Sequence, residues 1–184
     1  MNKAGKTEEI YKHMEVDGLR FHRWSEDKHA VVHKFKEIRN PNILFCDGLS
    51  NLFFLEVDHE GKTMLEEASA LGHFNSTFVL GMMLLAEGRQ RMQEALDMLN
   101  NAYRRTKGTW NPRATYSKVH FHLNRYGRKH VHFHGFHRTC VMHRFVISVS
   151  DAFFEERKSM ARCQIFLWDA RFIRFAGEFG IIYK

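Results

Sequence analysis

Histidine and cysteine side chains gather in the C-terminal third of the chain. Seven histidines fall between residues 120 and 143, and two of the three cysteines lie nearby, at 140 and 163. In Cys140-Val-Met-His143 two residues separate a thiol from an imidazole, a spacing that lets both bind one zinc ion. His137 and Cys163 are the candidates for the remaining ligands. No fixed spacing defines that second pair, so the sequence favours a basic, partly protonated surface over a zinc site.

Cations interleaved with aromatic rings form a second set of candidate binding residues. Arginine and lysine neutralise phosphates, and aromatic rings stack on bases, so this combination suits single-stranded nucleic acid. No recognition fold or motif accompanies these residues, and a run of charges is more often a solvated face. Nucleic-acid binding is therefore an alternative function, with the candidate residues Arg104, Arg105, Lys107, Trp110 and Arg113.

Motifs of catalysis are not found in the sequence. Gly61-Lys62-Thr63 ends like a phosphate-binding loop, but the glycine that the loop needs five residues earlier is Glu56. There is no Gly-x-Ser-x-Gly elbow, no paired-carboxylate spacing and no His-Glu-x-x-His. We therefore predict no catalytic residues, no enzymatic activity and no bound cofactor apart from the zinc alternative.

Charge divides the chain into two parts. Residues 1–103 carry 12 basic and 16 acidic side chains, whereas residues 104–184 carry 16 basic and 5 acidic ones. A basic half could meet nucleic acid or an acidic partner. The N-terminus has no apolar signal segment, the longest uncharged apolar run is too short to span a bilayer, and the odd, widely spaced cysteines fit a reducing compartment. We expect a cytoplasmic or nuclear protein that does not bind membranes.

Helical periodicity organises the middle of the chain. From Leu65 to Tyr103, apolar or small residues recur three or four positions apart, the period of helices that each bury one face. Gly72 and Gly88 stand where left-handed residues would end helices. A first helix begins at Ser25-Glu26-Asp27 and ends at Asn40-Pro41. Further helices are predicted over 41–55, 60–71, 74–87, 90–105 and 113–124.

Two segments repeat at an offset of 33 or 34 residues, the period of a two-helix solenoid unit. Gly48 corresponds to Gly81, and Met64–Ala68 corresponds to Met98–Ala102. Beyond residue 125 the alternation in His130–His134 and the β-branched residues in 144–149 favour short strands or irregular loops, and 164–179 fits a helix or a hairpin. The predicted fold is mainly α, a short solenoid of antiparallel helical hairpins. It comprises an extended N-terminal segment (1–24), a helical repeat domain (25–124) and a basic, His-rich C-terminal region (125–184).

These residues resemble a known family. Ala-Ser-Ala-Leu-Gly-His-Phe-Asn-Ser-Thr-Phe-Val-Leu-Gly, followed by Glu-Ala-Leu and a closing alanine, resembles a Sel1-like repeat, a relative of the tetratricopeptide repeat. Ile10-Tyr11-Lys12-His13, Asn40-Pro41, Cys163 and Trp168-Asp169 resemble a group of plant F-box proteins in which a short repeat region follows the F-box. Such relatives can carry Cys-x-x-Cys before Trp-Asp, but here Phe166 stands in place of the second cysteine.

The resemblance implies a substrate-recognition subunit of a ubiquitin ligase, attached through its F-box to a Skp1-type linker. Only ten residues precede Tyr11, and the Leu-Pro start of an F-box is absent from them. We therefore expect a helical interaction module that binds a client protein or peptide and lacks a recognisable F-box. Nucleic-acid binding and a zinc-binding C-terminal lobe remain the alternatives.

Overall fold

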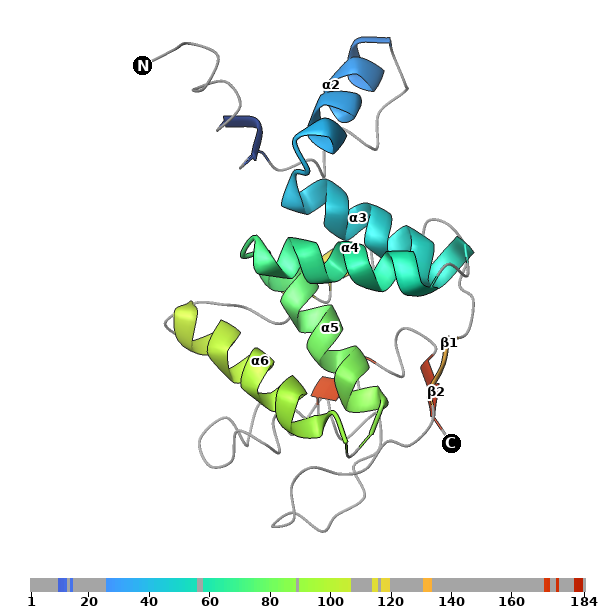
Figure 1. The fold of residues 1–184 in the computed structure, drawn as a ribbon, viewed down its shortest axis with the longest axis vertical. Coiled ribbons are helices and arrows are strands. Elements are labelled where there is room, and N and C mark those ends of the chain that lie inside the picture. Colours follow the sequence, from blue (N-terminus) through green and yellow to red (C-terminus); the bar gives the residue numbers. More distant parts are fainter. Residues whose placement is uncertain are drawn as a thin grey trace. The chain divides into compact units, whose positions relative to one another are not determined.

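The fold is mainly α in the computed structural model, which describes residues 10–12, 14, 26–55, 58–88, 90–106, 114–115, 117–119, 131–133, 171–172, 175 and 181–183 (Figure 1). Its helices are α2 (Glu26–Glu37), α3 (Pro41–Ser50), the π-helix η1 (Asn51–Leu55), α4 (Asp58–Ala70), α5 (Phe74–Ala86) and α6 (Met92–Arg105). Two short strands, β1 (Val131–Phe133) and β2 (Ile181–Tyr183), pair in parallel with Val131 opposite Ile181. The chain divides into two compact units, residues 1–77 and 78–184, with the boundary inside α5.

The helices lie where the sequence predicts them. The segment 41–55 is helical throughout, as α3 and η1, and the next three predicted helices correspond to α4, α5 and α6. The first predicted helix is α2, although Ser25 lies outside the described residues. Of the predicted helix 113–124, the described residues 114–115 and 117–119 are helical.

The C-terminal predictions can be compared with the structure at a few places. In the segment His130–His134, for which the sequence favours short strands or an irregular loop, residues Val131–Phe133 form β1. In the segment 164–179 the described residues Arg171, Phe172 and Phe175 are helical and buried. The segment 144–149, and most of the predicted extended segment 1–24, lie outside the described residues.

The first unit has a core at the α2–α3 end and a close helix crossing between α3 and α4. Val32, Phe35 and Ile43 form the core. Tyr11, from the helical turn Ile10–Lys12, packs its ring edge-on against that of Phe35, with 5.5 Å between the ring centroids. At the crossing, a Cβ added to Gly48 would lie 3.0 Å from the Leu65 side chain. One added to Gly61 would lie 2.7 Å from the backbone nitrogen of Leu52 and 2.8 Å from the carbonyl oxygen of Gly48. The two helices therefore approach so closely that Gly61 must have no side chain.

The second unit contains the same type of crossing. A Cβ added to Gly81 of α5 would lie 2.6 Å from the Leu99 side chain of α6. Gly48 and Leu65 precede Gly81 and Leu99 by 33 and 34 residues, which confirms the predicted repeat. The register extends to α2, because Val32 and Phe35 precede the buried residues Leu65 and Ala68 by 33 residues. The helix α2 therefore occupies the position of the second helix in a preceding hairpin.

Helices α5 and α6 are buried differently. The helix α6 buries one face (Ala95, Leu96, Leu99 and Ala102), as predicted. In α5 every residue from Ser76 to Ala86 is buried, so the expectation of a single buried face is wrong for this helix. Its run Phe78–Ala86 is apolar all round, which suits the centre of a helical layer. In the described part of the chain no helix has the length and apolarity that crossing a membrane requires.

Candidate functional site

The connections that precede α3 and α5 have the same backbone geometry. The amide of Asn40 donates to Phe35 O (2.9 Å) and that of Arg39 donates to Lys36 O (3.1 Å). The amides of His73 and Gly72 donate in the same way to Ala68 O and Ser69 O, both at 2.9 Å. This bond pair is a Schellman motif, in which one residue adopts the left-handed conformation. That residue is Gly72 (φ 88°) in the second connection, but it is Arg39 (φ 52°) in the first.

Asn40 joins three pieces of the first unit. Its side-chain oxygen accepts hydrogen bonds from the backbone nitrogens of Asn42 (2.8 Å) and Ile43 (3.4 Å), so it caps α3. Its amide nitrogen lies 2.5 Å from Tyr11 O and 3.3 Å from both Lys12 O and Met14 O. The side-chain amide of Asn42 also donates to Met14 O, at 3.2 Å. Asn40 is fully buried, so these bonds hold the N-terminal turn against the start of α3.

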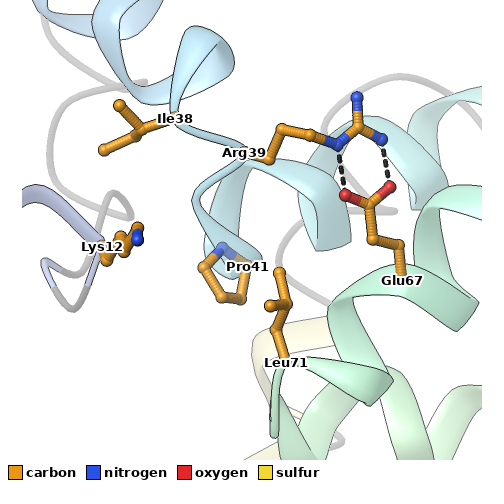
Figure 2. A pocket seen from close by; sticks show the side chains of 6 residues that line it. All are labelled: Lys12, Ile38, Arg39, Pro41, Glu67 and Leu71. Atoms are coloured by element: carbon orange, nitrogen blue, oxygen red, sulfur yellow. Dashed lines mark hydrogen bonds and ion pairs between the residues drawn. The ribbon is translucent and has the colours of Figure 1, made fainter.

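A groove opens beside this joint (Figure 2). Its volume is about 340 Å³, and six residues line it: Lys12, Ile38, Arg39, Pro41, Glu67 and Leu71. They come from the N-terminal turn, the α2–α3 connection, the first residue of α3, and the last turn of α4 with the residue that follows it. We call it the Leu71 groove, after the side chain that is most open to solvent among its apolar residues, at 55% exposure.

The charges of the Leu71 groove are unevenly paired. The Arg39 guanidinium donates from Nε and Nη2 to the two carboxylate oxygens of Glu67 (Figure 2). This bidentate hydrogen bonding holds the pKa of Glu67 below its ordinary value and raises that of Arg39. Lys12 has no ion-pair partner among the described residues. The lining as described therefore combines an apolar floor, one neutralised ion pair and one unpaired cation.

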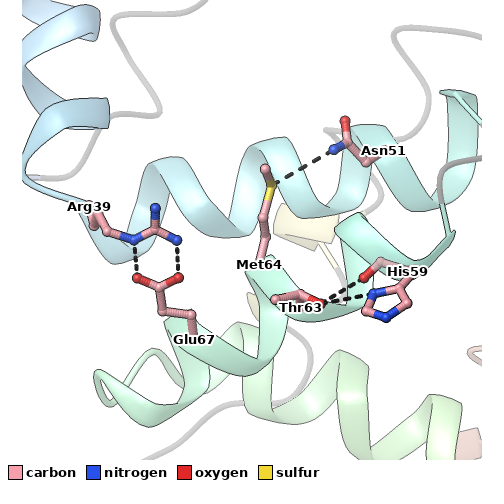
Figure 3. Close-up of polar contacts among 6 residues, drawn as sticks. All are labelled: Arg39, Asn51, His59, Thr63, Met64 and Glu67. Carbon is pink, nitrogen blue, oxygen red and sulfur yellow. Dashed lines mark hydrogen bonds and ion pairs between the residues drawn. The ribbon is translucent and has the colours of Figure 1, made fainter.

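Polar contacts fix α4 along the preceding helical segment (Figure 3). The Arg39–Glu67 pair ties the α2–α3 connection to α4, and the Asn51 amide nitrogen of η1 lies 3.8 Å from Met64 Sδ of α4. Within α4, the Thr63 hydroxyl donates to His59 O at 2.9 Å. The last turn of α4, which carries Glu67 and leads to Leu71, is therefore tied to the α2–α3 connection.

Large apolar side chains exposed to solvent gather at the same end of the first unit. Within the described ranges they are Ile10 (62% exposed), Met14 (39%) and Leu71 (55%). Ile10 and Met14 flank Lys12 in the chain, and Leu71 lines the groove. A local concentration of this kind is typical of interaction surfaces.

The binding residues predicted from the sequence fall into two groups. Cys140, His143, Cys163 and His137 lie outside the described residues, as do Lys107, Trp110 and Arg113. Arg104 and Arg105 are exposed in the last turn of α6. In the portion of the chain with described coordinates, no three potential metal ligands come together. Zinc and nucleic-acid binding stay predictions.

Sequence reasoning missed the Leu71 groove. One signal was available, because the 33-residue offset aligns Arg39 with Gly72 and Ile38 with Leu71. An arginine where its counterpart is a left-handed glycine indicates that its side chain has a role. The segments Tyr11-Lys12 and Asn40-Pro41 are far apart in the sequence, and the structure brings them into contact.

Comparison with known proteins agrees with the repeat architecture. A family model described as "Plant tetratrico peptide repeats" matches residues 17–119, more than half of the chain. The "Putative F-box protein At1g67623" of Arabidopsis thaliana is 24% identical over 100 residues, which are 54% of this chain and 34% of that protein. The chain thus spans about a third of the length of the curated relative that it matches. No solved structure matches it significantly. Because the family model covers the hairpins α3–α4 and α5–α6 in full, the chain belongs to the plant tetratricopeptide repeat family.

Proposed function

We propose that this protein is a non-catalytic interaction module that binds a client protein or peptide through its helical repeats. One observation carries the proposal: the glycine–leucine helix crossing recurs at the repeat period, in Gly48–Leu65 and Gly81–Leu99. Tandem hairpins of this kind present side chains from a rigid frame, and binding a partner is the use that such surfaces serve. Typical members of tetratricopeptide-like families are non-catalytic scaffolds, which supports the same proposal.

We further propose that the client is a substrate of a ubiquitin ligase, by analogy with the Arabidopsis relative whose name includes F-box. The Sel1-like character of the repeats and a cytoplasmic or nuclear location belong to this finer proposal. Direct contact with a Skp1-type linker is not part of it, since no F-box motif is recognisable in the printed sequence.

Affinity capture from native plant extract tests the proposal. The intact chain should enrich one or a few proteins over a variant with a disrupted core, such as Leu99→Asp, and the enrichment should survive nuclease treatment. Enrichment that disappears with nuclease would instead support the nucleic-acid alternative. A parallel pull-down of residues 1–184 with a purified Skp1-type protein should show no binding, and robust binding there would contradict the expectation that these residues hold no F-box.

A further inference from the structure

The Leu71 groove is large enough to hold a bulky side chain of a ligand. Its volume of about 340 Å³ lies at the small end of the range for ligand pockets, roughly 300–1,000 Å³. Ile38, Pro41 and Leu71 supply an apolar floor, and Leu71 is 55% exposed without an occupant. Covering these side chains removes apolar surface from water, which favours a large aliphatic or aromatic group as the occupant.

The charges at the groove favour a negatively charged group on the partner. Arg39 and Glu67 neutralise each other through two hydrogen bonds, so neither attracts a ligand strongly. The ammonium of Lys12 stands on the other side of the apolar floor (Figure 2). Among the described lining residues, it is the cation left to meet a ligand. A carboxylate next to the apolar group of the occupant would complement it.

The walls of the groove are fixed before any ligand arrives. Asn40 holds the backbone at Lys12 through side-chain hydrogen bonds to the carbonyl oxygens of Tyr11, Lys12 and Met14. The Arg39–Glu67 pair holds the opposite wall against α4. A site that does not have to order itself on binding loses less entropy and binds more tightly.

We propose that the Leu71 groove binds a peptide segment of a partner protein in which a large apolar side chain stands next to an aspartate or glutamate. The flanking apolar residues Ile10 and Met14 extend the contact surface along that peptide. This inference rests on the proposed interaction function and specifies its surface and its ligand.

The test uses the intact chain and a phage-displayed library of random peptides as the probe. Selected peptides should share a leucine, methionine or aromatic residue beside an acidic residue. Selection against Lys12→Glu should lose the acidic residue but keep the apolar one. Lys34→Glu, which makes the same charge reversal on an exposed residue of α2 outside the lining, should select the same peptides as the wild type.

The affinity of the best selected peptide is then measured by fluorescence polarisation. Leu71→Asp should weaken binding about tenfold or more, as expected for an apolar anchor. Lys12→Ala should weaken it about two- to fivefold, as expected for an exposed ion pair. Ala70→Asp places the same carboxylate on the preceding exposed residue, outside the lining, and should bind like the wild type. Thermal melting of each variant confirms that its fold is intact.

The inference is overturned if selection yields no shared apolar–acidic pattern, or if Leu71→Asp and Ala70→Asp bind alike. It is equally overturned if the same residues prove to hold nucleic acid or lipid vesicles instead of peptide. Repeating the client capture with Leu71→Asp distinguishes a failure of the proposed interaction function from a failure of its assignment to the Leu71 groove. A client that this variant still captures would leave the interaction function standing and remove the groove from it, whereas no client for any variant would remove the function itself.

Discussion

The first repeat (α3, η1 and α4) and the second (α5 and α6) form the same type of helix crossing, but the first has glycine in both helices and the second in one. Gly81 faces a side chain, Leu99, whereas the first repeat adds Gly61, which faces backbone atoms of Leu52 and Gly48. The connections before the two repeats differ as well, since a left-handed arginine precedes α3 and a left-handed glycine precedes α5. The two repeats therefore share one backbone geometry. The residues at which they differ, Gly61 and Arg39, make additional contacts, Gly61 with the backbone of the preceding segment and Arg39 with Glu67.

Substituting alanine at the two crossings should produce the largest difference between the repeats. Gly61→Ala should cost about 3 kcal/mol or more, because backbone atoms cannot turn away from a new methyl group. Gly81→Ala should cost about 1–2 kcal/mol, because the Leu99 side chain can shift and alanine regains about 1 kcal/mol of helix propensity. Urea denaturation followed by circular dichroism measures both. Equal losses would show that the two crossings are equally tight.

The two helix starts should differ by a smaller amount. Asn40→Ala removes the cap of α3 and the hydrogen bonds to partly buried carbonyl groups of the N-terminal segment, for a loss of about 2–3 kcal/mol. At the matched position before α5, His73 accepts a hydrogen bond from the Ser76 backbone nitrogen at 3.3 Å. His73→Ala should cost about 1 kcal/mol, typical of a lost cap. Limited proteolysis should also detect release of the N-terminal turn in Asn40→Ala alone, and an unchanged cleavage pattern would argue against the joint described for Asn40.

Substitutions at the two left-handed residues, Arg39 and Gly72, should change stability by still smaller amounts. A Cβ at Gly72 would meet no atom within 4 Å, so the cost of Gly72→Ala, about 1–2 kcal/mol, comes from its positive φ alone. Arg39→Gly relieves the same strain, but it loses the pair with Glu67 and adds freedom to the unfolded chain. We expect its stability to remain within about 1 kcal/mol of the wild type. A thermal-melting comparison of the two variants decides this, and a strongly stabilised Arg39→Gly would mean that the arginine contributes little to folding.

The Arg39–Glu67 pair should have the smallest effect, and that effect should depend on pH. Hydrogen bonding to Arg39 lowers the pKa of Glu67 from its ordinary 4.5, so the pair stabilises the folded chain above that pH and ceases to do so as the pH falls through the lowered value. Glu67→Gln should therefore cost less than about 1 kcal/mol at neutral pH, because Arg39 is exposed and Glu67 partly so. The difference from the wild type should vanish in acid and shrink in high salt. A difference that is independent of pH would assign the effect to packing.

The helical frame was predictable from the sequence because its signals are local. Apolar spacing, Asn40-Pro41 and the glycines at 72 and 88 depend on neighbouring residues alone, and the structure gives positive φ at both glycines. The repeat offset added one long-range relation, which the Gly–Leu crossings confirm.

The candidate site was not predictable by the same means. The Arg39–Glu67 pair and the bonds from Asn40 to the N-terminal turn join residues 26–29 positions apart, and no local pattern encodes them. Gly61 stands in no local pattern other than an incomplete phosphate-loop motif, because its tight contact depends on how α4 crosses the preceding segment. The π-helical turn at Asn51–Leu55 continues α3 without a break in helical spacing, so periodicity does not distinguish it.

The residue that follows Asn40 gives this joint chemical durability. Asparagine side chains age by deamidation, which begins when the backbone nitrogen of the next residue attacks the side-chain amide. Here that nitrogen belongs to Pro41, which carries no hydrogen and cannot close the ring. Hydrolysis to aspartate would replace the hydrogen-bond donor that faces Tyr11, Lys12 and Met14 with a second acceptor. The proline that starts α3 thus also protects the N-terminal attachment over the lifetime of the protein.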